Sequence, residues 1–165
     1  MVTQKRPAIF KDEYALIPLR ENGSQGFAKI DKEFSYLADN HFFYLNAQGY
    51  PMTKIDKKLV RLHRLIFTPS AGKFVDHING NKLDNRKCNL REATLANNSH
   101  NRSKLPRNTS GYKCVFKVGK RWRAKVQANG VVIHGGYFNT ALEAAKKANE
   151  IIIANHGDFA RINEI

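Results

Sequence analysis

The residues best suited to chemistry lie in segment 75–102, which reads VDHINGNKLDNRKCNLREATLANNSHNR. Asp76 and His77 are adjacent, Asn89 follows His77 by twelve residues, and Asn98 comes nine residues later. A carboxylate is a hard oxygen ligand and an imidazole is a proton acceptor, so the pair can combine a divalent metal with a general base. An Asn that returns from a following helix can complete the metal site. This set of groups is suited to hydrolysing a phosphodiester.

Each of these residues also has a structural interpretation. Asp76 could cap a turn at the end of a strand, His77 could be a hydrogen-bonded core histidine, and Asn89 could serve a turn. The adjacency of Asp76 and His77, together with the spacing to two Asn residues, favours the chemical interpretation.

Segment 75–102 resembles the HNH nuclease family, in the H-N-N variant of phage-type homing endonucleases. The resemblance implies that Asp76 and Asn98 bind the metal and that His77 activates water. It also implies that Asn89 holds the loop and the imidazole ring through hydrogen bonds. Carboxylate and amide oxygens suit Mg²⁺ or Mn²⁺.

The second metal ligand has alternatives. Asn97 is a weaker candidate than Asn98, and His100 lies two residues beyond it. On a helix, residues two apart point about 200° away from each other, so Asn98 and His100 cannot both face one metal. His63, in the phrase LHRLI, is open between a scaffold role and a phosphate contact.

The net charge of +14 and the pI of about 10.0 predict a polyanionic partner. Residues 1–57 hold eight Lys or Arg against seven Asp or Glu, whereas residues 58–105 hold ten against three and residues 106–165 ten against four. The excess positive charge therefore coincides with the candidate metal site and everything after it. Double-stranded DNA is the predicted partner, and neither a membrane nor a protein partner is predicted.

The pattern predicts an α+β chain of three parts. Residues 1–57 form a small β-rich block, with strands at 14–19 and 26–30, a helix capped by Asp31 within 31–40, and a hairpin of 42–45 with 50–54. Residues 58–105 form a ββα-metal nuclease core, with a strand at 74–78 and a helix from Glu92 to Arg102. Residues 106–165 form a three-stranded antiparallel sheet plus a helix.

The last part has the clearest local signals. Strands at 112–118, 121–128 and 131–138 are joined by short turns, the second of the Asn-Gly type favoured in hairpins. A capping box, Thr140 to Glu143, opens a helix that ends near Asn155. One face of that helix should carry mostly small or apolar residues, and its members are Leu142, Ala145, Ala148, Asn149 and Ile152.

This part resembles the plant ethylene-responsive-factor DNA-binding domain. The matching features are the Trp122 strand, GYFNT at 136–140 with EAA at 143–145, and GDFAR at 157–161. Cys114 and Phe116 depart from the family, which puts base contacts from the first strand in doubt. In the second strand Arg123, Lys125 and Gln127 alternate with apolar residues, so a basic row faces outward and can read base edges in a major groove.

The predicted DNA contacts are basic or amide side chains near the metal site and on this sheet. The alternative interpretation is that these side chains form a solvated basic face without a DNA-binding role. They are Arg86, Lys87, Arg91, Arg102, Lys104, Lys113, Arg121, Arg123, Lys125, Gln127 and His134.

Cys88 and Cys114 belong to no CxxC pair, which excludes a four-Cys zinc site. With no membrane-length apolar run and no signal peptide at its start, the chain is expected in the cytoplasm of a bacterium or a phage-infected cell. The predicted function is metal-dependent DNA endonuclease activity, either nicking or site-specific cleavage of the homing type. The alternative is a non-catalytic, sequence-specific DNA-binding regulator that uses residues 111–165.

Overall fold

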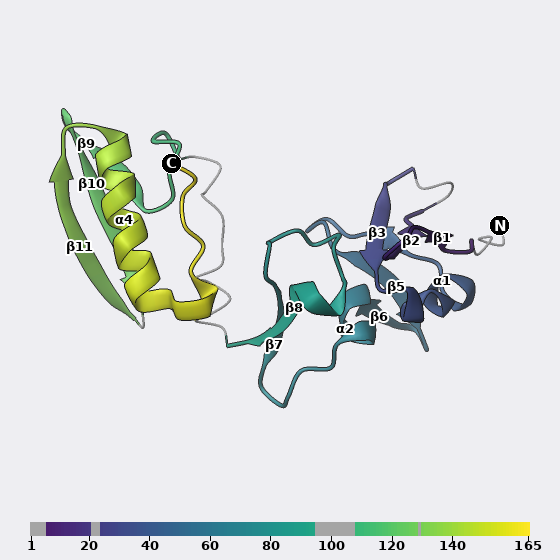
Figure 1. The fold of residues 1–165 in the computed structure, drawn as a ribbon. Helices are drawn as coiled ribbons and strands as arrows, with labels where there is room; N and C mark the ends of the chain where they lie inside the picture. The colour runs from purple at the N-terminus through teal and green to yellow at the C-terminus, as the bar shows by residue number, and fades with distance from the viewer. Residues whose placement is uncertain (1–5, 21–23, 95–107, 129) are drawn as a thin grey trace. The chain divides into compact units, whose positions relative to one another are not determined.

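The computed structural model describes residues 6–20, 24–94, 108–128 and 130–165, and the chain divides into two compact units, Met1–Ala93 and Thr94–Ile165 (Figure 1). Small antiparallel sheets and helices make up both units, in agreement with the predicted α+β class. The three-part division at residues 57 and 105 stays a proposal about functional organisation.

The first unit begins with a three-stranded antiparallel sheet of β1 (Ile9–Phe10), β2 (Ala15–Pro18) and β3 (Phe27–Ile30). The pairing of β2 with β3 confirms the first predicted hairpin. Alternate residues of these two strands are buried, because successive side chains of a strand point to opposite faces.

A 3₁₀ turn (Lys32–Phe34) and helix α1 (Tyr36–Asn40) follow, inside the range predicted to be helical. The prediction that Asp31 caps this helix is wrong. Asp31 makes no capping hydrogen bond, and its Oδ2 instead accepts one from the backbone N–H of Lys87 at 2.7 Å. Local sequence could not show this, because the partner lies 56 residues along the chain.

A second sheet follows, with strands β4 (Tyr44–Leu45), β5 (Pro51–Ile55) and β6 (Lys58–Arg61) in that order, and β6 leads directly into helix α2 (Leu62–Ile66). The pairing of β4 with β5 confirms the second predicted hairpin. Asp56 and Lys57, which connect β5 to β6, both have positive φ, as a type I′ hairpin turn requires.

The first unit has one hydrophobic core, and its members come from both sides of residue 57. They are Ala15, Ile17, Leu19, Ala28, Ile30, Leu37, Ala38, Phe43, Leu62, Ile66 and Leu90. The β-rich block and the start of the predicted nuclease core therefore share the same buried apolar surface.

The last two strands of this unit, β7 (Phe74–His77) and β8 (Leu90–Ala93), form an antiparallel pair. The strand predicted at 74–78 is confirmed, but the helix predicted to begin at Glu92 does not begin there. Glu92 lies in β8 opposite Val75, and its Oε1 accepts hydrogen bonds from the backbone N–H and the hydroxyl of Ser70. Residues 95–102, the rest of that prediction, lie outside the described residues.

The second unit is the predicted three-stranded antiparallel sheet plus a helix. Strands β9 (Val115–Val118), β10 (Arg121–Ala128) and β11 (Val131–Phe138) lie in the order β11-β10-β9, and helix α4 spans Ala141–His156. Strand β9 begins three residues later than predicted. Cys114, just before it, has a φ of 64°, which is left-handed backbone rather than strand.

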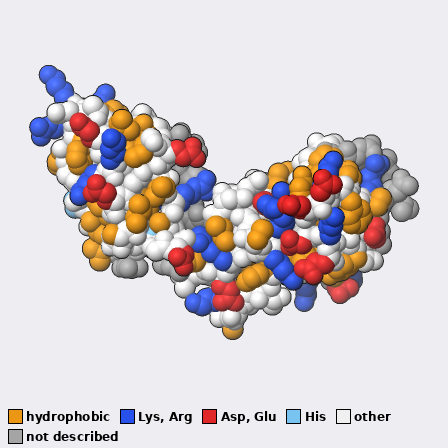
Figure 2. All heavy atoms as spheres, in the orientation of Figure 1, with side chains coloured by type: hydrophobic (Ala, Val, Ile, Leu, Met, Phe, Trp, Pro, Cys, Tyr) orange, Lys and Arg blue, Asp and Glu red, His pale blue; other side chains and the backbone are white. Residues whose placement is uncertain are grey.

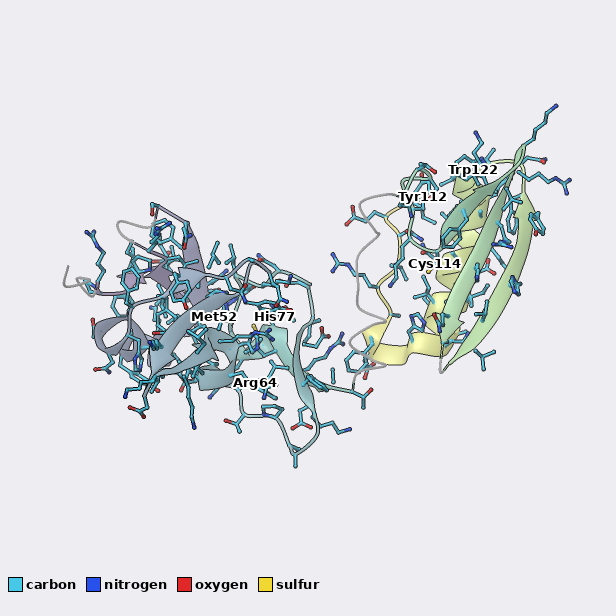
Figure 3. All side chains as sticks on the ribbon, turned by 180° about the vertical axis from the view of Figure 1, so that it is seen from behind. Met52, Arg64, His77, Tyr112, Cys114 and Trp122 are labelled. Atoms are coloured by element: carbon cyan, nitrogen blue, oxygen red, sulfur yellow. The ribbon has the colours of Figure 1, made fainter. Side chains whose placement is uncertain are left out.

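Helix α4 packs on the sheet through alanines. Its capping box is present as predicted, since Thr140 Oγ1 accepts from Glu143 N and Glu143 Oε2 accepts from Thr140 N. Leu142 is 42% exposed, so its predicted place on the buried face is wrong. The core cluster is Val115, Ala124, Val126, Ala144, Ala145, Ala148 and Ile152, with Tyr112, Cys114 and Trp122 packed against it (Figure 3).

On the face of each unit seen in Figure 2, Lys and Arg side chains are interspersed with Asp and Glu. None of the helices among the described residues has both the length and the apolar character needed to cross a bilayer.

Candidate active site

The β7–β8 hairpin carries the two adjacent residues that started the sequence argument. Asp76 lies opposite Arg91 in the pairing register, and His77 lies opposite Leu90. Both side chains are nearly buried, with exposed fractions of 5% for Asp76 and 4% for His77. A 3₁₀ turn at Lys87–Asn89 leads the chain back into β8.

Asn89 holds together the loop that joins these strands. Its Oδ1 accepts a hydrogen bond from the backbone N–H of Asn79 at 3.0 Å, and its Nδ2 donates to the carbonyl of Asp84 at 2.7 Å. Its own carbonyl accepts from the backbone N–H of Ile78. One buried amide thus ties both ends of the loop to each other, which is the loop-holding geometry expected of Asn89.

The His77 ring is oriented by Asn85. His77 Nε2 lies 3.2 Å from Asn85 Oδ1, and Asn85 is fully buried. Asn85 Nδ2 donates to the carbonyl of Lys82, which can only accept, so the amide orientation is determined. Its Oδ1 then faces the ring, and Nε2 must carry the proton in neutral His77. Nδ1 is therefore the nitrogen that can take a proton from water.

The role of Asn85 is the main site feature that the sequence did not reveal. The sequence groups it with Arg86 and Lys87 among the residues clustered about the site, with a DNA-backbone contact as the expected role. Strand β3, which lies far earlier in the sequence, holds Asn85 in place, because Asn85 N donates to the carbonyl of Lys29 at 2.7 Å.

Two further rings pack around His77, which is labelled in Figure 3. The ring centroid of His63 lies 5.2 Å from that of His77, and Tyr50 lies 5.5 Å from His63 and 6.1 Å from His77. His63 is 2% exposed, which favours the scaffold role over the phosphate contact.

Burial dominates the protonation of both histidines. It lowers the pKa of His63 to about 3, with the charges of His77, Arg61 and Arg64 acting in the same direction. Burial also lowers the pKa of His77 below 6.5, although the Asn85 hydrogen bond and the nearby charge of Asp76 partly oppose it. Both shifts favour the neutral form of the ring at pH 7.

Asp76 is bound by Arg91 across the hairpin. Arg91 Nε and Nη2 each lie 2.9 Å from Asp76 Oδ2. Arg91, predicted as a DNA contact, thus has a partner inside the site. The Asp76 carboxylate is a hard oxygen donor beside the His77 imidazole, and this donor chemistry would fit Mg²⁺ or Mn²⁺.

The rest of the predicted ligand set is not visible. Asn98, its alternative Asn97 and the neighbouring His100 lie outside the described residues, as do Arg102 and Lys104. Within the described ranges no group of three or more His, Cys, Asp and Glu residues is placed to hold a metal ion.

Besides Arg91, two predicted DNA contacts of the first unit have acidic partners. Arg86 donates through Nε and Nη2 to the two oxygens of Asp84, both at 2.8 Å, and this pairing lowers the pKa of Asp84. Lys87 Nζ lies 3.0 Å from Glu33 and is exposed. Their predicted DNA contacts remain proposals.

In the second unit, strand β10 presents the predicted basic row on the face opposite the helix. Arg123 pairs with Tyr137, Lys125 with His134, and Gln127 with Val132 in the sheet register. Arg121, Gln127 and His134 are exposed, whereas Arg123 and Lys125 are half-buried. Lys113 has a different setting: its Nζ is half-buried, donates to the carbonyl of Arg161, and has a lowered pKa because of that burial.

We expect Asn89→Leu to lower the free energy of unfolding of the first unit by about 2 kcal/mol, because one buried and one part-buried backbone group lose their partners. Urea unfolding followed by circular dichroism measures this. The control is Asn81→Ala in the same loop, whose exposed side chain should cost less than about 1 kcal/mol. Equal stabilities of the two variants would contradict the role assigned to Asn89.

Comparison with known proteins adds two findings. The family model described as HNH endonuclease matches residues 60–100. An uncharacterized HNH endonuclease, L560, of Acanthamoeba polyphaga mimivirus is 34% identical over 153 residues, which cover 88% of this chain and 78% of the relative. The chain belongs to the HNH endonuclease family.

The HNH segment contains Asp76, His77, Asn89 and Asn98. Protein 3.8 of Escherichia phage T7 is 36% identical over 92 residues, which cover 54% of this HNH chain and 75% of the phage protein. No solved structure gave a significant match. Membership of the family supports a nuclease that acts on DNA, and HNH nucleases generally use divalent metals.

Proposed function

We propose that this protein is a metal-dependent DNA endonuclease in which His77 is the general base. The observation that carries the proposal is the His77–Asn85 hydrogen bond, because it fixes the tautomer and leaves Nδ1 as the proton acceptor. Asp76 precedes His77 on the same strand, so a carboxylate ligand and a base are supplied by consecutive residues.

His77 would remove a proton from the water that attacks phosphorus. The imidazole is neutral at pH 7 because burial lowers its pKa, and a neutral ring is what base catalysis needs. The small exposed fraction is compatible with this role, since only one ring nitrogen has to meet the water. His63 and Tyr50 pack on the ring and limit its rotation.

Asp76 and Asn98 are the proposed metal ligands. Asn89 holds the loop that joins β7, which carries Asp76 and His77, to β8. When bound, the metal would neutralise phosphate charge and stabilise the departing 3′ oxygen. Arg91 keeps the Asp76 carboxylate in a fixed orientation through the hydrogen bond from its Nε and the ion pair from its Nη2.

The C-terminal sheet is the proposed DNA reader, as its resemblance to the ethylene-responsive-factor domain implies. Arg121 and His134 support this, because both are exposed on the sheet, where DNA can reach them. Together with a nuclease site, a reader of this kind is suited to site-specific cleavage of the homing type. One active site cuts one strand, so a monomer should nick.

We expect purified protein to convert supercoiled plasmid to open circles with Mg²⁺ or Mn²⁺ and to stop when EDTA removes the metal. The reason is that the proposed ligands are an anionic carboxylate and a neutral amide, so only the bound cation can neutralise the charge of the phosphate. Gel electrophoresis over time measures the nicking. Tight DNA binding with no cutting under either metal would favour the non-catalytic regulator instead.

A further inference from the structure

The ring of Tyr50, which packs beside the two histidines, also carries two cations. Arg61 Cζ lies 4.6 Å and Lys82 Nζ 4.5 Å from its centroid. Gln48 fixes both: its Oε1 accepts from Arg61 Nη2 at 3.1 Å and its carbonyl accepts from Lys82 Nζ at 2.8 Å. The two charges come from different parts of the chain and are held over one aromatic ring.

These cations differ from the other basic residues of the site in lacking an anion. Arg86 and Arg91 are bound to carboxylates, whereas neither Arg61 nor Lys82 has a carboxylate partner among the residues that the structure describes. Because neither charge is offset by a carboxylate, an anion would be attracted to them. Both side chains are only half-buried, so an anion from solution can reach them.

The cation pair is linked to the proposed base. The Tyr50 ring centroid is 6.1 Å from that of His77. Lys82 is also connected through hydrogen bonds, because its carbonyl accepts from Asn85 and Asn85 Oδ1 contacts the His77 ring. An anion held by Arg61 and Lys82 therefore lies in the neighbourhood of the water that His77 would activate.

We propose that Arg61 and Lys82, held over Tyr50, bind a DNA backbone phosphate adjacent to the one that is cut. The inference rests on the proposed function and adds two DNA-binding residues that the sequence did not single out. Arg61 supplies a planar fork that can hold two phosphate oxygens, and Lys82 supplies a compact charge. Contacts of this kind position the strand without reading its sequence.

The test measures DNA affinity without cleavage. Full-length protein is titrated into a fluorescent non-specific duplex in EDTA at several NaCl concentrations, and the slope of log affinity against log salt is compared between variants. Arg61→Gln and Lys82→Gln should each reduce the magnitude of the slope by about 0.9, the value for one lost phosphate contact. Lys58→Gln is the matched control, since Lys58 lies on strand β6 with Arg61 but three residues away, or about 10 Å.

Unchanged slopes for Arg61→Gln and Lys82→Gln would overturn the proposal, as would an equal reduction for Lys58→Gln, which would indicate a general basic surface. A second measurement avoids dependence on folded variants. In wild-type protein, acetylation of Lys82 followed by mass spectrometry should slow several-fold when duplex is present, while Lys58 should react at the same rate. Equal reactivity of Lys82 with and without DNA would also overturn it.

Tyr50 variants test how the cations are held. Tyr50→Phe keeps the ring face and should retain wild-type affinity, whereas Tyr50→Leu should reduce the slope as the cation variants do. If both behave alike, Tyr50 is not the platform and the proposal fails.

Binding and cutting report on different claims. If the wild-type protein never nicks but the slopes fall as expected, the anion site stands and the proposed function fails. If the protein nicks and the slopes do not change, the anion site fails alone. In an active enzyme, Arg61→Gln and Lys82→Gln should raise KM with little effect on kcat, because a phosphate contact is made equally before and during the reaction.

Discussion

Replacing His77 with alanine should lower the nicking rate constant by about 10²–10⁴-fold, the usual contribution of a positioned general base. The effect should be on kcat, since the ring activates water and does not hold DNA. Single-turnover nicking of supercoiled plasmid in Mn²⁺ measures it, with affinity in EDTA as the separate readout of binding.

His77→Gln is the companion variant. A glutamine can still donate to Asn85 but cannot accept a proton at neutral pH, so its loss of rate should approach that of alanine. His41→Ala, in the first unit, removes a half-buried histidine that has no assigned role in the site and should leave the rate constant unchanged. Wild-type nicking by His77→Gln would remove His77 from the chemistry.

The pH dependence of nicking follows from the same residue. Burial lowers the pKa of His77, so the neutral, active form persists below pH 6.5 and is lost only as the pH falls through that lowered pKa. Nicking rates measured from pH 8 downward should therefore begin to fall at a lower pH than they would with a base of ordinary histidine pKa.

Acid should destabilise the first unit through His63, and His63→Leu should remove much of that effect. The ordinary pKa of 6.5 applies to the unfolded chain, whereas the folded pKa is about 3, so the unfolded state takes up the proton first. Stability is complete above pH 6.5 and is lost as the pH falls toward 3. Each pH unit in that window costs about 1.4 kcal/mol, or about 3 kcal/mol by pH 4.

Urea unfolding at pH 7, 5.5 and 4.5 measures this difference. Leucine is close to histidine in size and has no titratable nitrogen, so the variant should lose less stability than the wild type on acidification. Trp122 is the chain's single tryptophan and lies in the second unit, so its fluorescence provides an internal reference.

The Asp84 carboxylate does not contribute to the loss of stability between pH 6.5 and pH 4.5. Its pKa is lowered by Arg86, so its contribution is present above its ordinary value of 3.8 and is lost only below it. An identical loss of stability in the wild type and in His63→Leu between pH 6.5 and 4.5 would contradict the assignment to His63.

The sequence predicted elements whose determinants are local. Alternating apolar residues located β2, β3 and β10, and Thr140 with Glu143 located the start of α4, because these signals involve neighbours in the chain. Adjacent Asp76 and His77 indicated the chemistry for the same reason.

The sequence-based predictions were wrong where the conformation of a residue depends on a partner far along the chain. Asp31 binds the backbone of Lys87 instead of capping a helix, and Glu92 is held in a strand by Ser70. Asn85 and Tyr50 were not recognised as neighbours of His77, since only the fold brings β5, β7 and the loop together. The half-exposed cations on Tyr50 could not be distinguished from other basic residues.

The attachment of the 81–89 loop to strand β3 limits how this enzyme can be engineered. Lys29 exchanges backbone hydrogen bonds with Leu83 and Asn85, and Asp31 binds Lys87. Excising the stretch that matches the HNH family, or transplanting it onto another scaffold, would leave these backbone groups without their partners and open the shared apolar interior. The smallest transferable piece must therefore include the N-terminal strands, and shuffling this motif between genes should succeed only when they travel with it.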